Sequence, residues 1–167
     1  MKENNMAKEP QVQSFLHGEP ITDKPRHVAR ELAAQTLYSL DFNSNLPPVE
    51  DFDIFQGLNQ EELEGLDEEI KIFASYLING TIEHLDEVDS LIEQYSTNRP
   101  IDKIDLVDRN ILRLGFFQLL YDKSTHPTII IDEAVKLSQA LSNDVSFKFI
   151  NGILDRFSKE RKCFILA

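Results

Sequence analysis

The sequence predicts an all-α protein. Apolar residues recur at the helical spacing of i, i+3, i+4 and i+7 through most of the 167-residue chain, and no two segments alternate like paired strands. Pro, Gly, Ser or Asn residues mark the breaks between the apolar segments. We therefore expect helices at residues 25–42, 68–96, 105–122, 130–142 and 144–160.

The helix expected at 105–122 carries apolar residues around nearly its whole circumference, which is typical of a helix buried on all sides. Asp105 is placed to cap its first turn, where a carboxylate accepts hydrogen bonds from free backbone N–H groups. Gly115 costs about 1 kcal/mol relative to Ala inside a helix and therefore indicates a close approach by another helix. We expect almost complete burial of four of its residues: Leu112, Leu114, Phe116 and Leu119.

The first and second of these helices each show one apolar face. The first begins at Lys24-Pro25, where Pro suits the first turn, and is expected to end near Phe42. Residues 68–96 predict either one long helix or two helices end to end. In both cases a bend is expected at Asn79-Gly80, because glycine weakens a helix interior.

One domain is expected at residues 24–160, with a disordered N-terminal tail at 1–23 and a short C-terminal tail at 161–167. Within the domain, residues 47–66 allow a short helix or two turns. The run Ile129–Ile131 resembles a buried strand, but it continues directly into helical spacing, so a helix is favoured.

The negative charge of the chain belongs to one middle segment. Residues 41–93 carry fifteen acidic residues and one basic residue, whereas the whole chain has a formal net charge of −12. A nucleic-acid surface therefore has to come from the two ends of the chain. One cysteine and an N-terminus without a long apolar run predict a cytoplasmic protein that does not enter a membrane.

The motifs of enzymes are missing from the sequence. The four histidines have no metal-ligand spacing, and no glycine-rich phosphate loop is present. Cys163 has no partner motif. We expect no catalytic residues, no metal and no cofactor, which leaves binding as the activity.

Four stretches together resemble the NusB family of bacterial transcription antitermination factors, over roughly residues 25–160. They are Ala29–Tyr38, Asp108–Gly115, Ile131–Leu137 and Ser146–Asp155. The resemblance implies two packed three-helix bundles and binding of the boxA RNA of ribosomal operon transcripts. It also implies a heterodimer with the NusE-type ribosomal protein and a place in the RNA polymerase antitermination complex.

The resemblance also implies a set of RNA-binding residues: Arg26, His27, Arg30, Tyr38, Tyr95, Lys148 and Phe149. Basic groups would hold phosphates and aromatic rings would stack on unpaired bases. We expect the set to form one surface. Tyr95, at a helix end, is expected to be exposed, whereas Tyr38 and Phe149 suit the core equally well.

The chain departs from the family pattern at several positions. The basic cluster of the first helix is reduced to Arg26, His27 and Arg30, and Val145, Phe147 and Gln118 stand where many members have an acid, a His and a Glu. A basic ribosomal partner would supply the missing charge and dock near the acidic segment 41–93, with apolar contacts from the second half of the chain.

Two other interpretations remain open. One is a helical protein of the same fold that does not bind RNA and self-associates, for example as a homodimer. The other is an accessory domain of an RNA methyltransferase, which is disfavoured because the chain ends at Ala167 without a cofactor-binding region.

Overall fold

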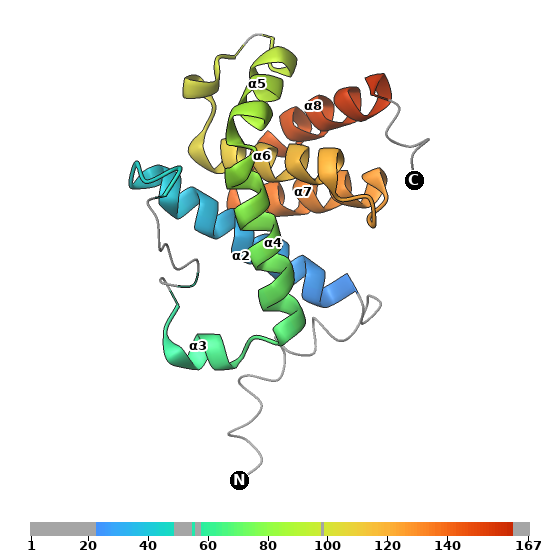
Figure 1. Cartoon of the computed structure of the whole chain (residues 1–167). Coiled ribbons are helices and arrows are strands. Elements are labelled where there is room, and N and C mark those ends of the chain that lie inside the picture. Colours follow the sequence, from blue (N-terminus) through green and yellow to red (C-terminus); the bar gives the residue numbers. More distant parts are fainter. Residues whose placement is uncertain (1–22, 49–54, 56–57, 98, 162–167) are drawn as a thin grey trace.

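The computed structural model describes residues 23–48, 55, 58–97 and 99–161. Over these residues the chain forms helices and no strand (Figure 1), so the all-α class is confirmed. The helices are α2 (Asp23–Phe42), α3 (Gln60–Glu64), α4 (Glu68–Glu83), α5 (Leu85–Tyr95), the 3-10 helix η2 (Ile101–Lys103), α6 (Leu106–Tyr121), α7 (Pro127–Leu141) and α8 (Ser146–Glu160). Apart from Asp23 and Arg161, the two expected tails lie outside the described residues.

Helix α6 lies at the centre of the molecule. It packs against α2, α4, α5, α7 and α8, while α2 also pairs with α4 and α7 with α8. This pairing is compatible with two packed three-helix bundles. The expected burial is confirmed, because the exposed fractions of the four α6 residues are 0% for Leu112, 1% for Leu114, 0% for Phe116 and 4% for Leu119.

Two further predictions for α6 are confirmed, the cap at Asp105 and the close approach of another helix at Gly115. The Asp105 carboxylate accepts a hydrogen bond from the backbone N–H of Val107 at 3.0 Å, as expected for an N-cap. A Cβ atom added to Gly115 would lie 2.8 Å from Cδ1 of Leu154. The helix that approaches at this glycine is therefore α8.

Residues 68–96 form two helices, and the break between them differs from the expected one. It falls at His84, between α4 and α5, whereas Gly80 lies inside α4. A Cβ atom at Gly80 would overlap the ring of Phe117. The glycine makes room for that ring from α6, so the predicted bend at Asn79-Gly80 is wrong.

The other helices agree with the prediction, with small shifts at their ends. Helix α7 begins at Pro127, three residues earlier than expected, because the ring of His126 caps it by accepting a hydrogen bond from the N–H of Thr128 at 3.1 Å. A short helix, α3, is present within 47–66, where Asn59 and Glu62 form a reciprocal capping box. Residues 49–54 and 56–57 of that stretch lie outside the described residues.

A partly buried polar network joins the end of α2 to α5 and α6. Oδ2 of Asp41 accepts hydrogen bonds from Nη1 of Arg113 at 2.8 Å and from Nδ2 of Asn110 at 3.0 Å, and it lies 3.0 Å from Nη2 of Arg109. Arg113 also donates two hydrogen bonds to the Asp89 carboxylate, at 2.7 and 3.0 Å. Charge-assisted hydrogen bonds of this kind are stronger than neutral ones and hold the three helices together at this end of the molecule.

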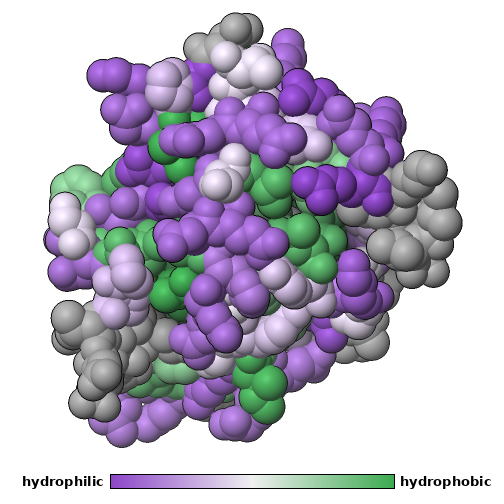
Figure 2. Space-filling view, turned by 45° about the horizontal axis from the view of Figure 1, so that its top comes forward, coloured by the Kyte–Doolittle hydropathy of each residue, from purple (hydrophilic) through white to green (hydrophobic). Residues whose placement is uncertain are grey.

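The face shown in Figure 2 is mostly hydrophilic, with hydrophobic side chains visible between the polar ones near its centre. No helix in the described part of the chain is long and apolar enough to span a bilayer.

Candidate nucleic-acid interface

The basic residues at the start of α2 lie around one aromatic ring. The guanidinium carbon atoms of Arg26 and Arg30 are 4.4 and 5.2 Å from the centre of the Phe73 ring. Arg30 is only 2% exposed, and its Nε donates a hydrogen bond to Oε1 of Gln118 at 2.8 Å. Gln118, one of the positions that depart from the family pattern, therefore binds a basic residue of the first helix.

His27 is paired with a carboxylate of α7. Its Nδ1 lies 2.6 Å from Oε2 of Glu133, whose side chain is 7% exposed. Burial would raise the pKa of Glu133, but the hydrogen bond and charge of His27, with the charges of Arg30 and Lys136, lower that pKa below its ordinary value. The pair joins α2 to α7 and leaves the imidazole about one-quarter exposed.

Tyr38 lies at the other end of α2 and is accessible. It is 36% exposed, and its ring centre is 6.0 Å from that of Phe42, which is 66% exposed. Tyr38 lines an apolar groove of about 300 Å³ that also includes Val107 and Ile111 of α6 and Leu141 of α7. We call this the Tyr38 groove.

Tyr95 is buried, so the expectation that it is exposed is wrong. Its exposed fraction is 5%, and its ring packs against those of Phe116 and Phe157, with centres 6.3 and 5.5 Å away. The guanidinium carbon of Arg156 covers it from outside at 4.5 Å. The helix end at Tyr95 is covered by α8, which follows much later in the chain.

Phe149 is half-buried, and its ring packs against a basic side chain, Arg99, that the sequence did not predict to be there. The guanidinium carbon of Arg99, in the loop after α5, lies 4.3 Å from the centre of the Phe149 ring. Lys148 beside it is exposed, as are Asn151 and Gly152 on the next turn of α8. The signal for Arg99 was a basic residue next to Pro100 at a helix break, which by itself indicates only a loop.

No neighbouring atom in the described part of the chain requires a glycine at position 152 of α8. A Cβ atom at Gly152 would meet no atom within 4 Å. Glycine in a helix interior costs about 0.5–1 kcal/mol relative to Ala, and at this exposed position it leaves the helix backbone open to a close approach by another molecule. We call Arg99, Lys148, Phe149, Asn151 and Gly152 the α8 patch.

The residues expected to form one surface therefore lie in separate places. Arg26, His27 and Arg30 are at the start of α2, Tyr38 is near its end, and Lys148 and Phe149 are in the α8 patch. Figure 1 shows the start of α2 far from the loop that follows α5. Arg30 and Tyr95 are buried, so they cannot contribute to a surface as expected.

These features define the class of protein. The described residues contain no cluster of three or more His, Cys, Asp or Glu side chains arranged to hold a metal ion. The surface of the protein presents cations against aromatic rings and an open apolar groove. The described residues thus form a helical scaffold with surfaces of the kind that bind other molecules.

Comparison with known proteins gives the family. The model of the NusB family matches residues 27–159, and the chain belongs to that family. It is 37% identical over 145 residues to the transcription antitermination protein NusB of Thermodesulfovibrio yellowstonii, a match that spans 83% of this chain and 94% of the relative. The corresponding protein of Borreliella burgdorferi is 39% identical over 135 residues, covering 80% of this chain and 93% of its own length.

Solved structures agree with this assignment. NusB of T. maritima superposes with a TM-score of 0.70 at 32% identity, covering 83% of this chain and 96% of that one. A chain from a crystal structure of the antitermination factors NusB and NusE in complex with double-stranded RNA superposes with a TM-score of 0.71 at 29% identity. That match covers 82% of this chain and 98% of the other.

Proposed function

We propose that this protein is a transcription antitermination factor. It binds the boxA RNA of ribosomal operon transcripts as a heterodimer with the NusE-type ribosomal protein, within the RNA polymerase antitermination complex. The observation that carries the proposal is the match to NusB proteins over more than 80% of the chain, including a NusB that was crystallised with NusE and RNA. The function is binding without catalysis, and its place is the cytoplasm, where transcripts are made.

The α8 patch is the part of the molecule best suited to single-stranded RNA. Lys148 supplies positive charge for phosphates, and the Arg99 guanidinium, packed on the Phe149 ring, supplies both charge and a planar group on which a base can stack. Arg26, His27 and Tyr38 remain in the proposal as further contacts along the strand. The buried residues Arg30 and Tyr95 contribute indirectly, by holding neighbouring side chains in place. Arg30 donates a hydrogen bond to Gln118, and the Tyr95 ring packs against the guanidinium group of Arg156.

The patch can be tested through its glycine. Gly152→Ala fills open space and improves helix propensity, so it should stabilise the free protein by about 0.5–1 kcal/mol. If RNA approaches the helix backbone there, the same change should weaken boxA binding several-fold. Fluorescence anisotropy with labelled RNA and a denaturant titration measure the two effects. A stabilised protein with unchanged RNA affinity would exclude Gly152 from the contact.

Charge substitutions in the patch provide the matched comparison. Arg99→Gln and Lys148→Gln should each weaken RNA binding and reduce the salt dependence of log K by about 0.7 per lost phosphate contact. Arg26→Gln tests the start of α2 in the same assay. Lys71→Gln is the control, because Lys71 lies on the acidic helix α4 and is 3.7 Å from Glu68. An Arg99→Gln variant with the wild-type salt slope would remove Arg99 from the RNA site.

The ribosomal partner is proposed to dock through both charge and apolar contact. The acidic residues within 41–93 attract a basic protein and raise its association rate. The Tyr38 groove offers the apolar contact, since Val107, Ile111 and Leu141 belong to the second half of the chain and Phe42 is exposed next to Tyr38.

Dependence on the partner decides between the heterodimer and the alternatives. With a net charge of −12, the isolated chain is repelled by RNA at long range. Labelled boxA RNA is titrated with this protein, with the ribosomal protein, and with their mixture. Tight binding by the mixture alone supports the proposal. Equally tight binding by this chain alone contradicts partner dependence, and a mixture that binds no RNA leaves the self-associating helical protein as the better interpretation.

A further inference from the structure

The end of α5 and helix α8 exchange an arginine and an aromatic ring where they meet (Figure 1). Arg99, in the loop after α5, lies over the ring of Phe149 on α8. In the opposite sense, Arg156 of α8 lies over the ring of Tyr95, the last residue of α5. The guanidinium carbon atoms are 4.3 and 4.5 Å from the two ring centres. We call these the two arginine–ring pairs.

In both pairs the ring is held by the core and the arginine is exposed. Tyr95 belongs to the hydrophobic core and Phe149 is packed against it, whereas Arg99 and Arg156 are exposed to solvent. Arginine stacks on aromatic rings through its planar guanidinium, which leaves the opposite face of that plane for another flat group. Unpaired bases of RNA stack on guanidinium planes as they do on aromatic rings. Each pair therefore presents a fixed, charged platform for one base.

The spacing along α8 places both pairs and the exposed glycine on one side of the helix. Phe149, Gly152 and Arg156 follow the i, i+3, i+7 pattern of a single helix face. The positions of Phe149 and Arg156 are about 10 Å apart along the helix axis, at about 1.5 Å per residue. Between them a Cβ atom at Gly152 would meet no atom within 4 Å. A strand can therefore pass from one arginine to the other close to the helix backbone.

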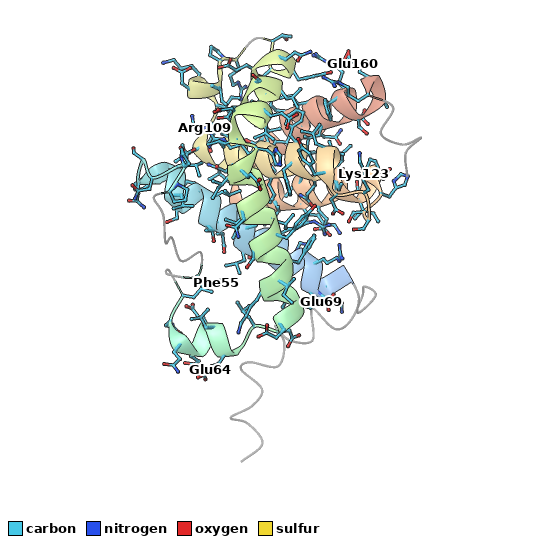
Figure 3. The ribbon with its side chains drawn as sticks, viewed as in Figure 1. Phe55, Glu64, Glu69, Arg109, Lys123 and Glu160 are labelled. Atoms are coloured by element: carbon cyan, nitrogen blue, oxygen red, sulfur yellow. The ribbon has the colours of Figure 1, made fainter. Side chains whose placement is uncertain are left out.

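The acidic neighbour of Arg156 does not prevent such a contact. Nε of Arg156 is 3.7 Å from Oε2 of Glu160, and the two side chains are 47% and 55% exposed. Figure 3 labels Glu160 on the last turn of α8. An ion pair between exposed side chains at i and i+4 adds little to stability, so Arg156 can leave this carboxylate for an RNA strand.

We propose that the RNA site extends along α8 from Arg99 to Arg156, with one unpaired base stacked on each guanidinium and the strand crossing the helix at Gly152. Arg156 then contacts RNA directly, and the buried Tyr95 is the support that orients it. The inference rests on the proposed function, because it assigns further contacts to the same RNA. Flat cations at both ends and an uncovered backbone between them suit a strand of bases that continues from the α8 patch.

Abasic nucleotides test the proposal one base at a time. The full-length protein and the ribosomal protein are mixed and titrated into labelled boxA RNA, in which each nucleotide in turn lacks its base. Arg156→Gln should weaken binding of the intact RNA by roughly fivefold or more, as expected for one lost base stack. Among the positions at which the wild-type protein is sensitive to base removal, one should become insensitive in Arg156→Gln and a different one in Arg99→Gln.

Two further variants separate stacking from charge. Arg156→Lys keeps the charge but loses the planar group, so it should keep the salt dependence of wild type while the same RNA position becomes insensitive. Lys159→Gln is the matched control, because it removes one positive charge from the same helix. Lys159 is 69% exposed and lies 2.9 Å from Asp155, and its loss should leave the pattern of sensitive positions unchanged.

Three results would overturn the extension of the site and leave the proposed function standing. They are a wild-type pattern of sensitive positions in Arg156→Gln, the same altered pattern in Lys159→Gln, and loss of ribosomal-protein binding by Arg156→Gln in the absence of RNA. The last of these would assign Arg156 to the protein interface. A wild-type mixture that binds no RNA would instead contradict the proposed function, and the extension with it.

Discussion

Leu112 shows how strongly one residue of the central helix contributes to stability. It is 0% exposed, and α6 packs against five other helices around it. Leu112→Ala removes buried methyl groups and leaves a cavity, so the free energy of unfolding should fall by roughly 2–5 kcal/mol. A urea titration followed by circular dichroism measures the change. Val145→Ala is the control, since Val145 is 67% exposed and its loss should change stability by less than about 0.5 kcal/mol.

The His27–Glu133 pair predicts how stability changes in acid. The pKa of Glu133 is lower in the folded protein than its ordinary value of 4.5. In the interval between those two pKa values the unfolded chain binds the extra proton, so stability present above pH 4.5 is lost as pH falls through the folded pKa. Urea titrations at a series of pH values should show this loss, and Glu133→Gln should reduce its slope. An equal slope in the variant would assign the acid sensitivity to other carboxylates.

Tyr95 and Arg99 show what local sequence could not reveal about single residues. Both lie at the end of α5, where a break in apolar spacing predicts an exposed loop. Tyr95 is buried because Phe116 and Phe157, far away in sequence, surround its ring. Arg99 covers Phe149 for the same kind of reason. The family resemblance pointed to Lys148 and Phe149, but it did not point to Arg99, which packs on the Phe149 ring.

At the scale of elements, helical spacing was sufficient to predict five of the long segments, but it misplaced one break. Gly80 looked like a bend because glycine is a poor helix former. In the folded chain it is the position where the Phe117 ring of α6 approaches α4. The actual break at His84 contains no Pro or Gly, so helix propensity did not predict it.

Two glycines in different helices should respond in opposite ways to the same substitution. Gly80→Ala places a methyl group against the ring of Phe117, which is 2% exposed, and should destabilise the protein by about 1–3 kcal/mol. Gly152→Ala meets open space and should be stabilising. Thermal unfolding of the two variants beside wild type gives the comparison. A Gly80→Ala variant as stable as wild type would mean that Phe117 moves aside at no cost.

At the scale of the whole molecule, three surfaces lie on three different parts of one scaffold. The α8 patch offers cations and a ring, and the Tyr38 groove is apolar at the end of α2. A larger groove between the first turns of α2, helix α4 and the turn after α6 combines apolar side chains with charges of both signs, Arg26 and Lys123 as well as Glu69. The charge map along the sequence anticipated a division between an acidic middle and two ends without net negative charge. It could not place the grooves, because each is built from residues of several helices.

The central position of α6 also determines how the protein comes apart. Neither the α2–α4 pair nor the α7–α8 pair can separate without exposing apolar surface of α6, so we expect the two halves to open together. Amide hydrogen exchange in the native state should therefore give the slowest, and nearly equal, rates in α2, α6 and α8. Helix α3, which has no buried residue, should exchange fast. A ligand in any one groove would then slow exchange throughout all three helices.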